Sequence, residues 1–446
     1  MVPGQSKSVV FDNNRNGNSV LRFLTVLFFI VFSALVLGRD VIGLPVNKYI
    51  FIVLGAVICF ICDKTELLCF VAFIAPLHTG VSGVYISGFA LIAFFIKNKQ
   101  IKRSNVSHLL IFALLALELI VGLHYEFSYV EYIRLAICFI LLFTVTLDSG
   151  LEVDGEKVLK FFLFGYFIAL ICIWGQMLRS FSFSQILSLG VRFGELSRVG
   201  IEDEGMRVSF NSNDLGFISM LAALFSLLLL KKSGKKLYIV PFAFAVITSI
   251  MTMSRGANIA LVIGLILYFL FSADNKRKTA RNVIIAVVSI AVLLQVMWWL
   301  IPNYFTAFSE RMGVEDISNG RWDIALFYFR ALWHNPVGLL FGVGLQKYNA
   351  KYDYTLSAHN ATQEILIAWG ILGFVIVMAL FVRAVIITKN NNPGFRLFQA
   401  VPLITLLIGL QSSQGFSGLS HMQYLLVCFM AFYLEYDNGI KKKEYD

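Results

Sequence analysis

Charged side chains are scarce in this chain. Of its 446 residues, 14% are charged and 58% are hydrophobic, and the mean hydropathy is +0.77. A soluble domain of this size could not bury so much apolar surface, which excludes an ordinary soluble protein. The net charge of +10 does not indicate nucleic acid, because most lysines lie in short clusters between apolar runs. We therefore expect a membrane protein without a nucleic-acid partner.

Cysteine is also rare. The chain has six cysteines, and all of them lie in apolar runs. Cys59 and Cys62 form a CxxC pattern, but no second pair of ligands accompanies it. Small residues in a membrane helix explain these cysteines better than metal or redox chemistry does.

Long apolar runs fill most of the sequence. A helix needs roughly 20 apolar residues to cross the hydrocarbon layer. Runs near that length begin at Leu21, Val46, Leu109, Tyr129, Val158, Leu215, Leu237, Gly256, Val283, Glu364, Leu397 and Met422. The run over residues 67–96 is too long for one span, and residues 76–83 divide it into two. We therefore predict an all-α polytopic membrane protein with about 14 transmembrane helices, within a range of about 12–14.

The basic clusters predict the orientation. One alternating set of loops carries Lys97, Lys99, Lys102 and Arg103, then Lys231, Lys232, Lys235 and Lys236, then Lys276, Arg277, Lys278 and Arg281, then Lys389 and Arg396, and finally Lys441, Lys442 and Lys443. The positive-inside rule places these loops and both termini in the cytoplasm. The polar residues 1–20 precede a run without a convincing cleavage site, so we expect no cleavable signal peptide.

This orientation divides the chain into five parts. They are a cytoplasmic tail (1–20), a transmembrane region (21–301) with an outer loop (179–213), a large outer loop (302–362), C-terminal transmembrane helices (363–436) and a cytoplasmic tail (437–446). The two long loops both fall on the outer side, which supports the predicted number of spans.

The cations of the outer loops are mostly arginine. They are Arg179, Arg192, Arg198, Arg207, Arg255, Arg311, Arg321 and Arg330. Lysine would set the orientation equally well, so this bias needs another cause. The planar guanidinium group binds phosphate oxygens in pairs and stays charged when it is partly desolvated. The alternative for each arginine is an ion pair with a neighbouring carboxylate such as Glu195 or Asp323.

Residues 321–334 of the large outer loop predict an amphipathic helix. Trp322, Leu326, Phe329 and Trp333 recur on one face, whereas Asp323 and Arg330 lie on the other. An aromatic stripe of this kind usually means burial at a membrane interface. We expect a helix that lies on the membrane and forms a lid or wall over a bound substrate.

Residues 357–373, SAHNATQEILIAWGILG, combine polar groups with the start of an apolar helix. We predict Ser357 as the N-cap, which places His359 and Asn360 at the positive end of the helix dipole. Such an end attracts anions and keeps imidazole neutral, so that it can accept a proton. Gly370 and Gly373 would let another helix approach closely. The alternative for a single histidine at the interface is a structural or snorkelling role.

Four further segments belong to the same predicted face of the membrane. They are residues 206–216 (MRVSFNSNDLG), 253–257 (MSRGA), 320–323 (GRWD) and the glycine-punctuated turn 335–344 (NPVGLLFGVG). The first three contribute Arg207, Arg255 and Arg321, and the turn suits close approach of the backbone to a ligand. Three arginines and His359 at one face would suit a diphosphate leaving group and a hydroxyl nucleophile.

The sequence resembles the superfamily of bacterial inner-membrane O-antigen ligases and O-antigen polymerases. His359 and Asn360, followed by nine residues, Gly370, two residues and Gly373, are similar to a signature of its periplasmic loop. The segment MRVSFNSND resembles the arginine and NPN segment that begins a central span, except that Ser212 replaces the usual proline. The MSRGA, GRWD and NPVGLLFGVG segments follow in the expected order. The likeness covers about residues 198–380.

The resemblance implies a membrane-embedded fold of the C type among glycosyltransferases and a substrate linked to undecaprenyl diphosphate. It implies that Arg207, Arg255 and Arg321 hold the lipid diphosphate, with Arg207 also catalytic, and that His359 activates or orients the acceptor hydroxyl. Guanidinium groups stabilise a departing diphosphate, and proton removal needs a base with a pKa near neutrality. Weaker candidates are Asn213, Asp214, Asn360, Glu364 and Arg330. The outer loops lack an Asp-x-Asp motif, so we predict metal-independent transfer without a cofactor.

We predict a polymerase, whose donor and acceptor are both undecaprenyl-diphosphate-linked oligosaccharides. The large number of spans, the 42 phenylalanines and the altered central segment favour it over a ligase that transfers the glycan to lipid A–core. A polymerase of capsule or exopolysaccharide would have the same features. Membrane lipids and a chain-length regulator protein are the further expected partners.

A transporter of the same lipid-linked sugars is the alternative from another class. Against it, the sequence shows no internal repeat and no charge pairs in the middle of the predicted spans. Glu118 is isolated within an apolar run and has no partner that the sequence identifies.

Overall fold

The computed structural model describes residues 15–98, 105–124, 127–188, 192–195, 207–272, 302–312, 320–413 and 415–436, with scattered helical positions between 281 and 299. Several predictions lie outside these residues. They are the tail 437–446, most of the tail 1–20, most of the span that begins at Val283, Arg198, and the basic residues at 99–103, 276–278 and 441–443.

The described part of the chain is helical and contains no strand. Its α-helices are α1 Arg15–Leu37, α2 Lys48–Ile61, α3 Lys64–Ile74, α4 Gly83–Lys97, α5 Asn105–His124, α6 Tyr129–Thr146, α7 Gly155–Ser180, α8 Phe183–Ser188, α9 Ser212–Ser233, α10 Ile239–Met251, α11 Arg255–Ser272, α13 Pro302–Met312, α14 Arg321–Trp333, α15 Pro336–Phe341, α16 Tyr348–Lys351, α17 Ala361–Asn390, α18 Val401–Leu410 and α19 Leu419–Met430. A π-helical turn, η1 Gly38–Ile42, follows α1.

Seven of the described helices are long and apolar enough to cross a membrane. These stretches are Phe23–Ile42, Val106–His124, Tyr129–Thr146, Gly155–Ser180, Ser212–Ser233, Arg255–Ser272 and Ala361–Asn390. Shorter apolar helices cover Lys48–Ile61, Gly83–Lys97, Lys236–Met251, Leu397–Leu410 and Leu419–Tyr433. The chain therefore has the helical, multi-pass character that the sequence predicts, while the predicted fourteen spans are not confirmed. The long run over residues 67–96 does divide near Pro76 into α3 and α4.

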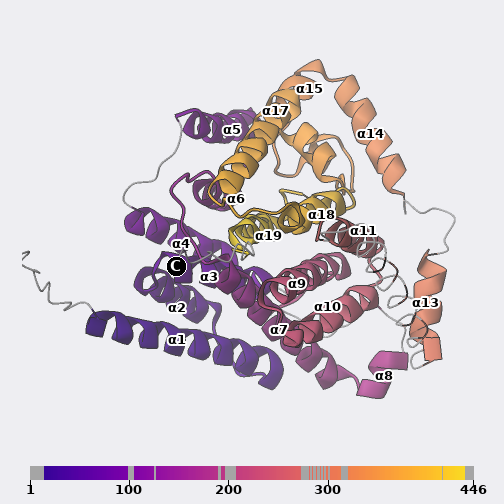
Figure 1. Cartoon of the computed structure of the whole chain (residues 1–446). Coiled ribbons are helices and arrows are strands. Elements are labelled where there is room, and N and C mark those ends of the chain that lie inside the picture. Colours follow the sequence, from indigo (N-terminus) through magenta and orange to yellow (C-terminus); the bar gives the residue numbers. More distant parts are fainter. Residues whose placement is uncertain are drawn as a thin grey trace, which may run out of the picture.

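Helix α9 lies at the centre of the bundle. It packs against α7, α10 and α11 (Figure 1), and its side chains from Leu215 to Leu229 are buried. Outer helices expose apolar side chains instead, such as Phe23 on α1 and Phe112 on α5. Exposed apolar side chains of this kind suit a lipid environment, in which backbone polar groups are satisfied within each helix.

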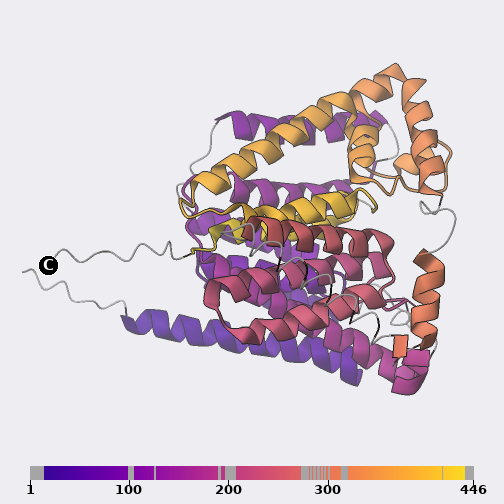
Figure 2. The ribbon, with the colours of Figure 1, turned by 45° about the vertical axis from the view of Figure 1, so that its right-hand side comes forward.

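The two ends of the bundle differ. In Figure 2, the start of α1 and the end of α19 lie at one end, whereas the orange helices α13 and α14 lie at the other. This arrangement agrees with termini that share one side of the membrane and long loops that share the opposite side. The assignment of those sides to cytoplasm and exterior still depends on the positive-inside rule. We call the end with α14 and the start of α17 the loop end.

The large outer loop folds into its own small core. The buried residues of this core are Ile324, Tyr328, Leu332, Val343, Tyr348, Ala358 and Ile367. The Tyr328 hydroxyl donates to the carbonyl of Leu356 (2.6 Å), and the N–H of Ala358 donates to the Tyr348 hydroxyl (2.8 Å). The first bond joins the segment before α17 to α14, and the second joins it to α16.

The residues predicted to form an amphipathic helix are helical in α14, and the aromatic stripe of this helix is open. Trp322, Phe329 and Trp333 are 71%, 61% and 67% exposed, whereas Ile324 and Tyr328 on the opposite face are buried. The protein thus covers one face of α14 and leaves the stripe uncovered. Contact of this stripe with the membrane stays a prediction.

Helix α17 is bent at Gly370. This residue has φ 62° and ψ −167° inside the helix. The bend frees carbonyl groups, and those of Ile367 and Ala368 accept hydrogen bonds from the N–H groups of Val343 (2.9 Å) and Gly344 (2.8 Å). The loop after α15 is therefore hydrogen-bonded to the broken turn of α17.

Glycines make this approach possible. A Cβ at Gly370 would lie 2.3 Å from the carbonyl carbon of Leu340, and one at Gly342 would lie 2.1 Å from the carbonyl oxygen of Ala368. The sequence led us to expect that turn 335–344 would approach a ligand. In the structure, the glycines of this turn let its backbone pack closely against α17. The close approach is therefore between two parts of the protein.

Candidate active site

A cavity of about 280 Å³ lies at the loop end, beside the start of α17. It is lined by Arg255, Gly256, Ile259, Arg321, Trp322, Ala325, Ala358, His359, Asn360, Gln411 and Ser412. Arg255 is the first residue of α11 and Arg321 is the first residue of α14. The structure thus brings together two of the three predicted diphosphate-binding arginines and the predicted catalytic histidine. We call this space the His359 cavity.

His359 has an unusual backbone and a shifted pKa. Its φ is +49°, in the left-handed region that non-glycine residues seldom adopt. Burial lowers the pKa of the half-buried His359 imidazole, and the positive charge of Arg321 lowers it further. The imidazole is therefore neutral near pH 7 and able to accept a proton.

The helix after His359 starts later than predicted. The N-cap of α17 is Asn360, whose side chain accepts from the N–H of Gln363 (2.9 Å), so the prediction of Ser357 was wrong. The Asn360 amide also donates to the carbonyl of Gln411 (3.0 Å). Asn360 thus fixes α17 to the end of α18 at the edge of the cavity.

Close packing of α11 and α18 forms another wall. A Cβ at Gly256 would lie 1.7 Å from the Ser412 hydroxyl oxygen. Only glycine at this position lets Ser412 line the cavity beside Arg255. Gln411 and Ser412 were not among the predicted site residues, because the apolar run that contains them carries no charged group.

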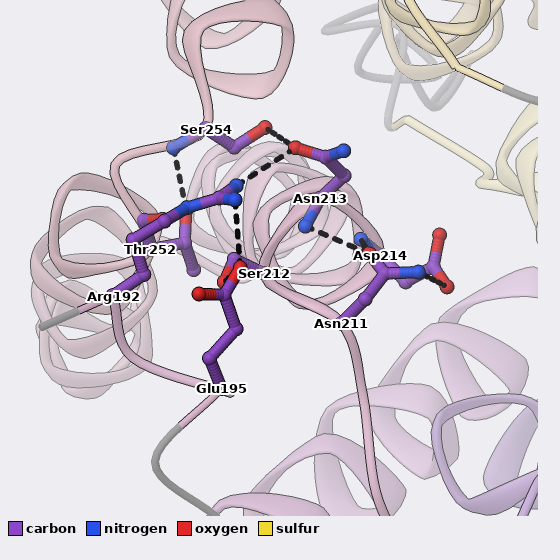
Figure 3. Close-up of polar contacts among 8 residues, drawn as sticks. All are labelled: Arg192, Glu195, Asn211, Ser212, Asn213, Asp214, Thr252 and Ser254. Atoms are coloured by element: carbon purple, nitrogen blue, oxygen red, sulfur yellow. Dashed lines mark hydrogen bonds and ion pairs between the residues drawn. The ribbon is translucent and has the colours of Figure 1, made fainter. Parts of the chain in front are cut away.

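The start of α9 is joined to the start of α11 by side-chain contacts (Figure 3). The Asn213 carbonyl oxygen accepts from the Ser254 hydroxyl (2.9 Å) and from Arg192 (3.1 Å). Arg192 also forms an ion pair with Glu195 (2.7 Å). An ion pair with a neighbouring carboxylate was the alternative to phosphate binding that we considered for each arginine. Asn213 therefore fixes the segment that immediately precedes Arg255 and does not line the His359 cavity.

Asp214 and Glu364 have structural partners. Asp214 lies 3.5 Å from the buried His421 imidazole, and Asn211 donates to it (2.8 Å). Glu364 accepts from the N–H of Gly415 (2.8 Å) and from the Ser417 hydroxyl. Among the lining residues of the His359 cavity neither carboxylate occurs. His421, which directly precedes the apolar run that begins at Met422, was not among the predicted site residues.

Arg207 lies elsewhere at the loop end and does not line the His359 cavity. Its neighbour Val208 donates its N–H to Asp40 (3.0 Å), which is buried and paired with Arg39 (2.6 Å). The backbone of Arg207 passes Gly80, where a Cβ would lie 2.7 Å from its carbonyl carbon. A role of Arg207 in diphosphate binding stays a prediction.

Arg330 faces a different hollow. Together with Asp323 and His334 it lines a space on the outer side of α14. Arg321, at the start of the same helix, lines the His359 cavity. The two arginines of α14 therefore lie on different surfaces. Arg330, which was a weaker candidate, is not placed with the other site residues.

The buried helices, with a cationic cavity at one end of the bundle, define a multi-pass membrane protein with a polar site at its surface. Residues 240–378 match the family model described as O-Antigen ligase, and this range includes Arg255, Arg321 and His359. This match supports the O-antigen ligase and polymerase superfamily, which the sequence resemblance indicated. No curated protein matches the chain in sequence.

Proposed function

We propose that the protein is a surface-polysaccharide polymerase that joins undecaprenyl-diphosphate-linked oligosaccharide repeat units at the periplasmic face of the bacterial inner membrane. The convergence of Arg255, Arg321 and His359 on one cavity is the observation that carries this proposal. The family match supports an enzyme of ligase or polymerase type over a transporter.

The proposed reaction is a single glycosyl transfer. A hydroxyl oxygen of the acceptor sugar attacks the anomeric carbon of the donor, and the bond from that carbon to the diphosphate oxygen breaks. The diphosphate leaves with the electron pair, and its charge is stabilised by Arg255 and Arg321. The neutral imidazole of His359 takes the hydroxyl proton as the new glycosidic bond forms.

The two arginines also support metal-independent transfer. Fixed guanidinium groups supply the positive charge that a divalent cation would otherwise bring to the diphosphate. In a reconstituted assay with purified protein and lipid-linked repeat units, EDTA is expected to leave the rate unchanged. A rate that falls with EDTA and returns with added magnesium would contradict this part of the proposal.

In the proposed reaction, Arg207 contributes from outside the His359 cavity. It lies seven positions before Asp214 at the start of α9, on the same end of the bundle as His359. We infer that it contacts the lipid diphosphate of a substrate that extends beyond the cavity. The roles of Asn360 and Glu364 are to position the start of α17, consistent with their contacts.

A ligase is the second candidate, because the matched family model is described as O-Antigen ligase. Deletion of the gene separates the two functions. Loss of a polymerase leaves a single repeat unit on the final acceptor, whereas loss of a ligase leaves long chains on undecaprenyl diphosphate. Complementation with the natural chain is expected to restore long glycan, and the His359→Asn variant is expected to fail. Long chains stranded on the lipid carrier would reject the polymerase.

The proposed orientation has its own test. We infer that both termini are cytoplasmic and that the His359 cavity faces the periplasm. Described basic residues lie in the last turns of α4, α9 and α17 (Lys97, Lys231 and Lys389), whereas His359 precedes the start of α17. A fluorescent-protein fusion after residue 446 is expected to fluoresce, and an alkaline phosphatase fusion at the same point is expected to be inactive. The reverse pattern would place the cavity in the cytoplasm. A chain-length regulator is a further proposed partner, to be sought by cross-linking in native membranes.

A further inference from the structure

A second cavity lies at the loop end, apart from the His359 cavity. Its volume is about 560 Å³, and it is lined by Lys48, Tyr49, Ile52, His78, Thr79, Ser82, Gly83, Val84, Tyr85, Arg134 and Leu419. These residues come from the starts of α2, α4 and α19, from the turn between α3 and α4, and from α6. We call this space the Lys48 cavity.

The Lys48 cavity combines cations with aromatic rings. The Lys48 ammonium nitrogen lies 5.7 Å from the centre of the Tyr49 ring, and the Arg134 guanidinium carbon lies 5.6 Å from that of Tyr85. Arg134 also donates to the Tyr85 hydroxyl (3.1 Å). Tyr49 and Tyr85 are both exposed. Cations bind phosphate oxygens, and exposed aromatic faces offer flat apolar surfaces to sugar rings.

The charge of this cavity is positive. Arg134 pairs with Glu131 (2.6 Å), but both side chains are substantially exposed, so this pair is weak and open to exchange with an incoming anion. Among the described residues no carboxylate pairs with Lys48. His78 is buried at the cavity wall, and its imidazole lies 3.1 Å from the Gln423 amide oxygen.

One wall of the Lys48 cavity touches the segment of Arg207. The Thr79 hydroxyl donates to the carbonyl of Ser209 (3.0 Å). Leu419, at another wall, belongs to the same helix as His421, which lies beside Asp214. Gln411, directly after α18, lines the His359 cavity, and Leu419, the first residue of α19, lines the Lys48 cavity. The two cavities therefore flank the start of α19, and Arg207 lies on the side of the Lys48 cavity.

We propose that the Lys48 cavity binds the phosphorylated, glycan-bearing head of the second lipid-linked substrate, the acceptor. Lys48 and Arg134 bind its phosphates, Tyr49 and Tyr85 pack on its sugars, and the glycan extends toward His359. This inference rests on the proposed function, in which Arg255 and Arg321 hold the donor diphosphate. It explains why a polymerase with two lipid-linked substrates has two cationic cavities at one end of its bundle.

The experiment measures binding stoichiometry. Full-length protein in phosphatidylcholine nanodiscs is titrated with undecaprenyl diphosphate and followed by native mass spectrometry. The natural chain is expected to bind two molecules. The variant Lys48→Gln/Glu131→Gln/Arg134→Gln, which removes both cations and the paired carboxylate, is expected to bind one. Arg255→Gln/Arg321→Gln is also expected to bind one, and the combined variant none.

A matched control removes cations at the opposite end of the bundle. Lys157 and Lys160 lie in the first turns of α7 and line a separate apolar hollow, so Lys157→Gln/Lys160→Gln is expected to bind two molecules. In the variant Lys48→Gln/Glu131→Gln/Arg134→Gln, the affinity of the Lys48 cavity is expected to fall roughly tenfold or more, because hydrogen bonds to charged groups contribute at least this factor. Binding of two molecules by the Lys48 variant, with unchanged affinities, would overturn the inference.

Two competition measurements identify the ligand of the Lys48 cavity. Phosphatidylglycerol in tenfold excess is expected not to displace the second molecule, and displacement would assign the Lys48 cavity to an anionic phospholipid headgroup instead. Inorganic pyrophosphate is expected to compete only weakly, because it lacks the lipid. In the polymerisation assay, the Lys48 variant is expected to need roughly tenfold more acceptor for half-maximal rate. Retained polymer in the His359→Asn variant would instead reject the proposed function, whatever the stoichiometry.

Discussion

Arg321 and His359 line the same cavity, although one begins α14 and the other precedes α17. The charge of Arg321 adds to burial in lowering the pKa of His359. Gln363 connects the same two helices by donating to the carbonyl of Ala325 (2.7 Å). In the proposed reaction, this pair couples phosphate binding by Arg321 to the protonation state of His359.

The first prediction concerns the pH dependence of the reaction. His359 must be neutral to accept a proton, so activity is lost as the pH falls through its pKa in the folded protein. That pKa lies below the ordinary value of about 6.5, because burial and Arg321 disfavour the charged form. Arg321→Gln removes the positive charge and is expected to move the acidic limb of the kcat/KM profile to higher pH.

The position of the limb is independent of the lower rate that this variant also shows. Arg255→Gln serves as the control, since Arg255 is not among the causes of the His359 shift. If the acidic limb of the Arg321→Gln profile stays in place or moves to lower pH, the charge of Arg321 does not lower the pKa of His359. The measurement is the initial rate between pH 4.5 and about 8 in a buffer of constant ionic strength.

The second prediction separates the imidazole from its backbone conformation. Asparagine tolerates the left-handed region far better than alanine does, so His359→Asn preserves φ near +49° while it removes the base. We expect normal membrane levels and a rate lower by about 10²–10⁴-fold, measured as loss of long glycan on a gel. Full polymer length in this variant would show that His359 is structural.

The third prediction tests the bend in α17. Gly370→Ala places a Cβ 2.3 Å from the backbone of Leu340, so the loop after α15 must move. The comparison is Gly234→Ala: Gly234 also has a positive φ (+65°, with ψ 1°), but nothing lies within 4 Å of an added Cβ. The conformational cost is about 1 kcal/mol at Gly234, which lies in the left-handed helical region. Gly370 has ψ −167°, in a region that essentially only glycine adopts, where the cost is about 1–3 kcal/mol. We expect the added contact with Leu340 to lower the apparent Tm of Gly370→Ala further still. Equal losses in the two variants would mean that the loop is not held at the bend.

Sequence patterns predicted the helices but not how their ends are fixed. Apolar runs locate α9 and α17 because burial in lipid requires their length. Ser357 and Asn360 are both good caps, three positions apart, and the bond from Asn360 to Gln411 decides between them. That bond joins residues 51 positions apart, which no local pattern records.

The same reasoning explains which of the predicted arginines share a cavity with His359. Arg255 and Arg321 each begin a helix next to glycine, and that local pattern led to the site. Arg330 follows Arg321 on the same helix, but its position around the helix axis turns it to another surface. Arg207 lies beside Gly80, and this pairing of distant segments depends on tertiary packing alone.

The fourth prediction concerns Glu118, whose partners the sequence did not reveal. Its carboxylate accepts from the Trp369 indole (2.6 Å) and from the N–H of Leu345 (3.0 Å). Glu118→Ala leaves both donors buried and unsatisfied, at a cost of about 1–3 kcal/mol each. Glu118→Gln keeps one acceptor oxygen in place. We expect a lower apparent Tm for the alanine variant than for the glutamine variant, and the opposite order would mean that burial of the carboxylate dominates.

The fifth prediction tests whether Asp40 positions the Arg207 segment. Asp40 is fully buried, pairs with Arg39 and accepts from the N–H of Val208. Asp40→Asn weakens both contacts, and loss of one partner of a buried ion pair can cost about 3–5 kcal/mol. Activity is therefore compared at equal amounts of folded protein, measured by size-exclusion chromatography of each variant.

If Asp40 acts through Arg207, its substitution matters only while Arg207 is present. We expect Asp40→Asn to lower the rate in the natural chain and to add no further loss in Arg207→Gln. A double-mutant cycle measures this coupling directly, since residues that act through each other are not additive. Independent, multiplying losses would assign Asp40 to the stability of the turn at Gly38–Ile42 alone, and would leave the position of Arg207 to other contacts.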